Sequence, residues 1–93
     1  MEDPLAALNE IAQTIFDKKG INVLALDVRG VSSLTDFVVI AEGNVDRHVK
    51  AIADAVIEKM RTLGVKPCYV EGLVEGEKIL IFFVTAGNRH FIF

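Results

Sequence analysis

The sequence predicts one α+β domain in which a mixed β-sheet is flanked by helices. The chain has 93 residues, a length that suits a single domain. Two segments space their apolar residues by three and four, as amphipathic helices do, and five shorter segments are rich in β-branched and aromatic residues. The predicted order is therefore α-β-β-α-β-β-β, and no repeat or linker divides residues 1–93.

The first helix is predicted to begin at Pro4 and to end before Gly20, because proline suits the first helical position and glycine a helix end. Residues 23–28 are nearly all apolar, which is typical of a central strand covered on both faces. A turn at 30–33 separates them from a second apolar strand at 37–41.

The second helix is predicted over residues 44–63, with Asn44 as its cap and Gly64 as its stop. Lys50 and Asp54 have opposite charges at i, i+4 on its polar side. Because this long helix joins the second strand to the third, those two strands are expected to run parallel, which would make the sheet mixed.

Three short strands are predicted in the last third of the chain. They occupy residues 68–71, 79–84 and 90–93, with an acidic turn between Gly72 and Gly76 and a second turn at 86–88. Cys68 lies at the start of the first of these strands, where a small apolar core residue is the simplest interpretation.

Composition narrows the classes of function. Hydrophobic residues make up 52% of the chain, an excess that predicts an interface with a partner or with a second copy. Asp and Glu outnumber Lys and Arg by 13 to 10, so nucleic acid is not expected as the main contact. The longest apolar run, residues 79–84, is too short to cross a membrane, and the acidic start does not resemble a targeting signal. We therefore expect a cytoplasmic protein.

The chain shows no pattern of catalytic or metal-ligating residues. It has no Asp-x-Asp pair, and Glu75-x-Glu77 falls in a predicted turn, where glutamates are usually solvated. His48 has no second metal ligand three or four residues further along its helix. No catalytic residue, cofactor or metal is predicted. Arg47, His48 and Lys50 cluster near the positive end of the second helix, which fits either an acidic or anionic contact or an ordinary solvated surface.

Two long blocks and one short block of the sequence resemble the ribosomal silencing factor family, also called Iojap or RsfS. Residues 26–40 read LDVRGVSSLTDFVVI, residues 46–54 read DRHVKAIAD, and residues 69–72 read YVEG. The resemblance implies a fold like that of nucleotidyltransferases but without their catalytic carboxylates. It further implies a protein that binds the large ribosomal subunit through a ribosomal protein on the subunit-joining face. Such a protein blocks association with the small subunit and represses translation when nutrients are short, without being an enzyme.

Residues from about 77 to 93 depart from the family pattern, since Lys78 stands where the family has tryptophan and Phe82 where it has aspartate. Candidate partner-binding residues carried over from the matched blocks, or chosen by their place in the strand that follows, are Asp36, Arg47, His48, Lys50, Glu71, Lys78, Leu80 and Phe82. Two other functions stay open: a nucleotide-binding or nucleotidyltransferase-like enzyme, and a self-associating module, which includes a homodimer.

Overall fold

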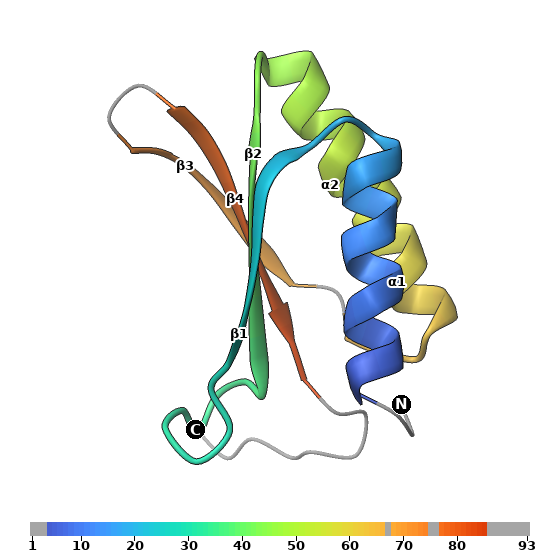
Figure 1. The fold of residues 1–93 in the computed structure, drawn as a ribbon, viewed down its shortest axis with the longest axis vertical. Helices are drawn as coiled ribbons and strands as arrows, with labels where there is room; N and C mark the ends of the chain where they lie inside the picture. Colours follow the sequence, from blue (N-terminus) through green and yellow to red (C-terminus); the bar gives the residue numbers. More distant parts are fainter. Residues whose placement is uncertain (1–3, 67, 75–76, 86–93) are drawn as a thin grey trace.

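Two helices pack on one face of a four-stranded sheet in the computed structural model of the chain (Figure 1). The structure describes residues 4–66, 68–74 and 77–85. Within them the elements follow one another as α1 (Pro4–Asp17), β1 (Ile21–Asp27), β2 (Phe37–Gly43), α2 (Asp46–Thr62), β3 (Tyr69–Val74) and β4 (Glu77–Val84). The α+β class and the order of the first six predicted elements are confirmed. The predicted turn at 86–88 and the strand at 90–93 lie outside the described residues.

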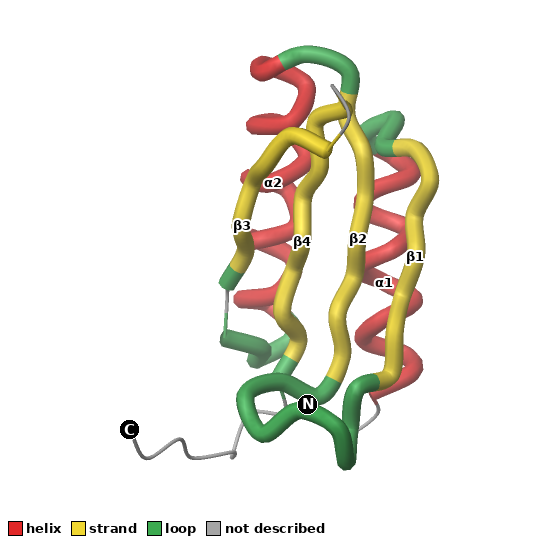
Figure 2. Tube along the Cα trace, turned by 90° about the vertical axis from the view of Figure 1, so that its left-hand side faces the viewer, coloured by secondary structure: helices red, strands yellow, loops and turns green. Residues whose placement is uncertain are grey.

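All strand pairings are antiparallel among the described residues, and the strands lie in the order β1-β2-β4-β3 (Figure 2). The prediction of a mixed sheet is therefore wrong for this part of the chain. The helix α2 does return the chain so that β2 and β3 run in the same direction, but the β3–β4 hairpin places β4 between them. Each strand thus pairs only with neighbours of opposite direction.

The strand β1 is an edge strand, and its side chains are mostly exposed. The prediction that it is central and covered on both faces is wrong. An apolar run shows that both sides of a strand tolerate burial, but it does not show where the strand lies in the sheet. Here both helices lie behind the sheet as seen in Figure 2, so that no helix of the described residues covers the opposite face of the sheet.

The core lies between the helices and the covered face of the sheet. Its buried side chains come from α1, α2, β2 and β4, together with Val65, which follows α2. The members of α1 and α2 recur at helical spacing, as in Ile11 and Ile15 or Val49, Ile52 and Val56, whereas those of β4 alternate as Leu80, Phe82 and Val84. Each element therefore contributes one apolar face.

The ends of α2 and β3 differ from the prediction. The residue Val45 precedes α2 without a side-chain cap, and Asn44 lies outside the helix. The helix ends before Gly64, whose φ of 73° is the left-handed conformation expected of a glycine stop. The strand β3 continues through Gly72 to Val74, so Gly72 is a strand residue and not the start of a turn; the other predicted boundary, Gly76, lies outside the described residues.

Candidate partner-binding surfaces

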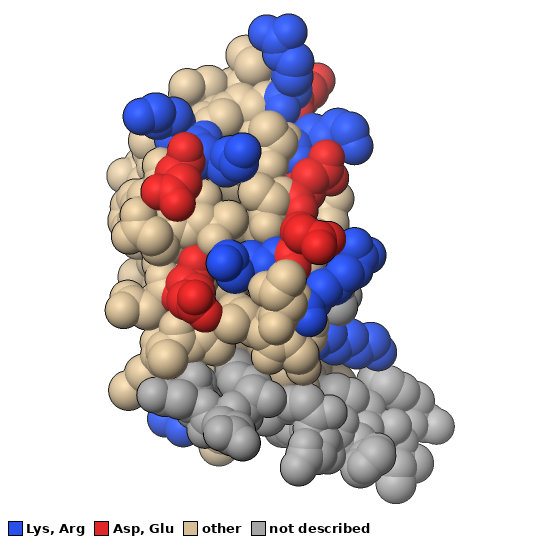
Figure 3. All heavy atoms as spheres, turned by 90° about the vertical axis from the view of Figure 1, so that its right-hand side faces the viewer, with Lys and Arg blue, Asp and Glu red and all other residues tan. Residues whose placement is uncertain are grey.

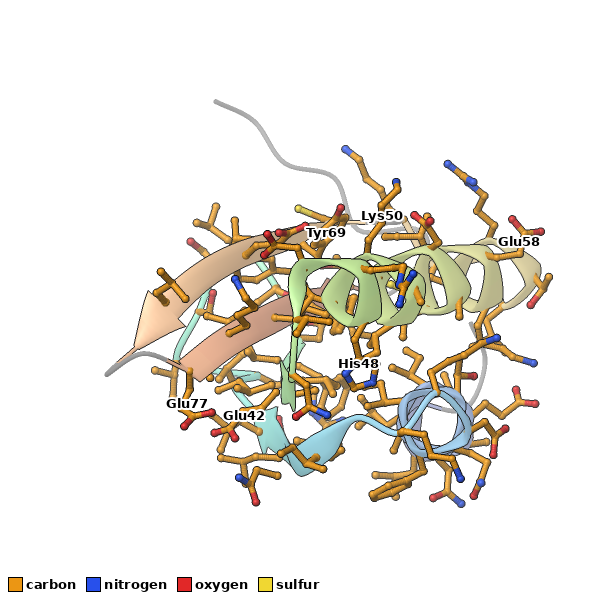
Figure 4. The ribbon with its side chains drawn as sticks, turned by 90° about the horizontal axis from the view of Figure 1, so that it is seen from above. Glu42, His48, Lys50, Glu58, Tyr69 and Glu77 are labelled. Atoms are coloured by element: carbon orange, nitrogen blue, oxygen red, sulfur yellow. The ribbon has the colours of Figure 1, made fainter. Side chains whose placement is uncertain are left out.

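The imidazole of His48 connects the two helices. Its Nδ1 accepts a hydrogen bond from the Asn44 amide at 2.9 Å, and its Nε2 lies 2.7 Å from the Lys18 carbonyl oxygen. Because an amide can only donate, Nδ1 is unprotonated and Nε2 carries the proton that is donated to Lys18. Figure 4 shows His48 between α2 and α1. Both ring nitrogens are used inside the chain, so His48 fixes the start of α2 to the end of α1 and has no nitrogen left for a partner.

Two other predicted residues, Glu71 and Lys78, meet in a cleft between the start of α2 and the β3–β4 hairpin. We call it the upper cleft; it encloses about 390 Å³ and is lined by Asp46, Val49, Glu71, Gly72, Leu73, Lys78 and Ile79. The Lys78 ammonium lies 2.5 Å from the Asp46 carboxylate. The cleft therefore presents charges of both signs beside apolar side chains, which suits a protein surface better than a single small ion.

Arg47 and Lys50 lie on the exposed side of α2. Lys50 points outward in Figure 4, and its ammonium lies 3.6 Å from Asp54, which confirms the predicted i, i+4 pair. Figure 3 shows lysines, arginines and acids intermixed over this side of the molecule. Exposed pairs of this kind contribute about 0.3–0.5 kcal/mol. The surface of α2 is thus a solvated helix face of mixed charge, without a patch of one sign.

The remaining polar candidate, Asp36, lies far from the others. It precedes β2, whereas α2 begins after the far end of β2, and a seven-residue strand spans about 23 Å. Its backbone holds the lower end of the sheet: the amide of Asp36 donates to Val84 at 3.2 Å and its carbonyl accepts from Val28 at 2.9 Å. The structure does not bring Asp36 together with Arg47 or Lys78.

Leu80 and Phe82, which were also predicted to contact a partner, offer no exposed surface in this structure. Both side chains are fully buried beneath the helices. Because side chains alternate along a strand, their neighbours Ile79, Ile81 and Phe83 point to the opposite face of the sheet. The sequence could not decide between the two sets, since every residue from 79 to 84 is apolar.

The block at residues 26–36 builds a loop rather than a reactive site. The guanidinium of Arg29 donates to the Asp27 carboxylate at 2.7 and 3.0 Å and lies 4.8 Å from the centre of the Phe37 ring. Its hydrogen bonds hold the pKa of Asp27 below the usual value, and the same pair raises the pKa of Arg29. The Ser32 hydroxyl accepts hydrogen bonds from the amides of Leu34 and Thr35, as serine hydroxyls commonly do in turns.

An apolar surface that was not predicted from the sequence lies on the side of the sheet opposite the helices. We call it the open sheet face. Its side chains form cross-strand rows, since Leu24 pairs with Ile40, Ile40 with Ile81, and Ile81 with Val70. All of its members are half-buried or exposed, and they are Leu24, Leu26, Val38, Ile40, Val70, Ile79, Ile81 and Phe83. The surplus of apolar residues was the only signal for it, and that signal did not say where the surplus lies.

A groove continues the open sheet face at its lower end. It encloses about 470 Å³, and its apolar lining comes from Val28, Leu34, Val38 and Phe83. Cys68 also lines it and is exposed, so the prediction of a buried core cysteine is wrong. Cys68 comes directly before β3, and its carbonyl accepts a hydrogen bond from the Phe83 amide at 3.0 Å.

Within residues 4–66, 68–74 and 77–85, no three His, Cys, Asp or Glu side chains are grouped as ligands of a metal ion would be. In the same ranges, neither helix is long and apolar enough to cross a membrane.

Comparison with known proteins identifies the family. The profile described as "Ribosomal silencing factor during starvation" matches residues 1–88. The ribosomal silencing factor RsfS of Haemophilus influenzae is 31% identical over 77 residues, which cover 83% of this chain and 76% of that protein. Its namesake from Bacillus subtilis is 34% identical over 65 residues, which cover 70% of this chain and about half, 55%, of the relative. No solved structure matches significantly. The chain belongs to the ribosomal silencing factor family.

Proposed function

We propose that this protein represses translation by binding the large ribosomal subunit and blocking its association with the small subunit. The observation that carries the proposal is the family match over residues 1–88, together with relatives that are named ribosomal silencing factors. We propose a ribosomal protein on the subunit-joining face as the contact. A ribosomal partner leads us to expect the protein in the cytoplasm.

The proposed mechanism is occlusion without catalysis. Two subunits that must meet over a broad face are kept apart by any rigid body fixed between them. A helix layer packed on a sheet is about 20 Å thick, which is many times the gap that interface contacts tolerate. The fold supports such a role because both helices and the two central strands share one core.

We propose that the polar part of the contact lies around the upper cleft. Glu71 and Lys78 line this cleft, and Arg47 and Lys50 follow at the start of α2. Asp36, at the opposite end of β2, is a second and separate candidate. The mixed charges and the net charge of −3 favour a protein contact over one made mainly to RNA phosphates.

Co-sedimentation with purified large subunits, at low and at raised salt, tests this function. We expect binding that survives raised salt, and we expect the bound protein to reduce formation of joined ribosomes in a sucrose gradient. Arg47→Glu should weaken binding, whereas Arg61→Glu, at the other end of the same helix, is the matched control and should not. Absence of binding, or binding without any effect on joining, would contradict the proposal.

A further inference from the structure

The open sheet face has the size of a functional patch. Four strands, of which β2 has seven residues, present about 19 Å by 23 Å, or about 440 Å² in projection. The largest apolar patches on single-chain proteins are about 300–600 Å² and are often functional. At the edges of this face, Leu24 is 51% exposed and Val70 is 50% exposed. Such a surface is costly to leave in water, so it points to a binding role.

The lower end of the face offers a recess for an anchoring side chain. The groove shares Val38 and Phe83 with the face itself, so the two form one continuous apolar surface. Residues that dominate the free energy of protein–protein contacts are commonly aromatic or arginine side chains seated in such pockets.

The upper end of the face is acidic. Glu42 and Glu77 lie side by side there in Figure 4, on neighbouring strands. The Glu42 carboxylate accepts a hydrogen bond from Asn22 at 2.7 Å, but none of the ion pairs among the described residues involves either glutamate. Like charges on neighbouring strands repel each other. A cation supplied by a partner would relieve this repulsion.

We propose that the open sheet face docks a protein partner whose surface has an apolar centre bordered at one end by lysine or arginine. The proposal rests on the function proposed above and identifies the contact: this partner belongs to the large ribosomal subunit. The upper cleft then supplies polar contacts at the border, since Ile79 belongs to the open sheet face and also lines the cleft.

The face itself argues against two other occupants. Among the described residues its members are all apolar and its upper end is acidic, so RNA phosphates find no cation on this part of the face; Lys66 is a cation that lines the lower groove. A second copy of the chain fits less well because the described members of its own open sheet face include no lysine or arginine that could meet Glu42 and Glu77.

Paired substitutions test the proposal. Val70→Glu and Leu24→Glu each place a charge at an exposed edge of the open sheet face. Phe16→Glu is the matched control, because Phe16 is an apolar side chain of similar exposure, 54%, on α1. We expect the two face variants to bind large subunits at least about thirty-fold more weakly, as for loss of an interface hot spot, and the control to bind like the wild type. Circular dichroism must show that all three remain folded.

The single cysteine provides a second readout on the unmodified protein. Cys68 lines the groove and is exposed, so we expect rapid alkylation in the free protein and at least tenfold slower alkylation with saturating large subunits. Replacing both Glu42 and Glu77 by glutamine should weaken binding and reduce its salt dependence, because the proposed cation contact is lost.

The outcomes separate this inference from the proposed function. If the wild type does not bind large subunits, both fail. If the wild type binds but the face variants bind equally well, or Cys68 is alkylated at an unchanged rate in the complex, the inference fails and the proposed function stands. If light scattering over a dilution series shows a dimer that Val70→Glu dissociates, a second copy occupies the face and the inference is overturned.

Discussion

Phe82 and Phe83 are neighbours in β4 that point to opposite faces of the sheet, and replacing each by alanine tests the register of the fold. Phe82 is fully buried, with its ring 5.9 Å from that of Tyr69, whereas Phe83 is only partly buried on the open sheet face. We expect Phe82→Ala to be far more destabilising than Phe83→Ala.

The expected magnitudes follow from burial. Truncating a fully buried phenylalanine costs about 3–5 kcal/mol, since it removes apolar contacts and leaves a cavity. For Phe82 this includes about 0.5–1.5 kcal/mol from the aromatic pair with Tyr69. A domain of this length has about 5–14 kcal/mol of total stability, so Phe82→Ala removes a large part of it. Phe83 loses less buried area and leaves no internal cavity, so about 1 kcal/mol is expected.

Urea unfolding followed by far-ultraviolet circular dichroism measures both effects. With a slope of about 1.5 kcal/mol per molar, the unfolding midpoint should fall by about 2 M or more for Phe82→Ala and by about 0.7 M for Phe83→Ala. A shift of one residue in the pairing of β4 would exchange the two faces. Equal losses, or a larger loss for Phe83→Ala, would therefore refute the register and the location of the open sheet face.

Three further changes test local features of the structure. His48→Ala removes the hydrogen bond to Lys18 that links the two helices and the local one from the Asn44 amide, and it should lower the free energy of unfolding by about 1–3 kcal/mol, whereas the exposed control Lys50→Ala should leave the thermal midpoint nearly unchanged. Gly43→Ala places a methyl group 2.7 Å from a Val49 methyl and should cost about 1–3 kcal/mol in urea unfolding; Gly72→Ala meets nothing within 4 Å and should be neutral or slightly stabilising. Because Arg29 lowers the pKa of Asp27, this ion pair stabilises the folded state fully above about pH 4 and stops doing so as the pH falls through the lowered pKa. Unfolding titrations of Asp27→Asn should thus differ from the wild type at neutral pH and converge with it in acid, and a difference that grows in acid would contradict this sign.

The sequence was a good guide wherever the signal is local. Both helices were predicted within a few residues, because helical spacing and the glycine after each helix are visible along the chain. The hydroxyl of Ser32 and the ion pair of Lys50 with Asp54 were also predictable, since each partner lies within four residues. The family, too, was identified from contiguous blocks of sequence.

The candidate site was predicted less well, because it depends on contacts between residues that lie far apart along the chain. Arg47 is exposed and Glu71 and Lys78 line the upper cleft, so these candidates are accessible to a partner, whereas Leu80 and Phe82 are buried beneath the helices. His48 looked like a surface contact because its partner Lys18 is thirty residues away along the chain. None of these relations can be read from spacing.

Local patterns along the chain were enough to show which segments form helices and strands, and composition showed that the chain carries more apolar residues than one small core can hold. The positions of those apolar residues depend on the three-dimensional arrangement of the strands and helices. This arrangement places both helices on one face, inserts β4 between β2 and β3, and leaves β1 at the edge. An apolar residue in a strand is satisfied by burial on either face, so the choice of face depends on which long-range pairings form. Those pairings leave the opposite side of the sheet without a helix from the described part of the chain, and this is where we propose that the partner binds.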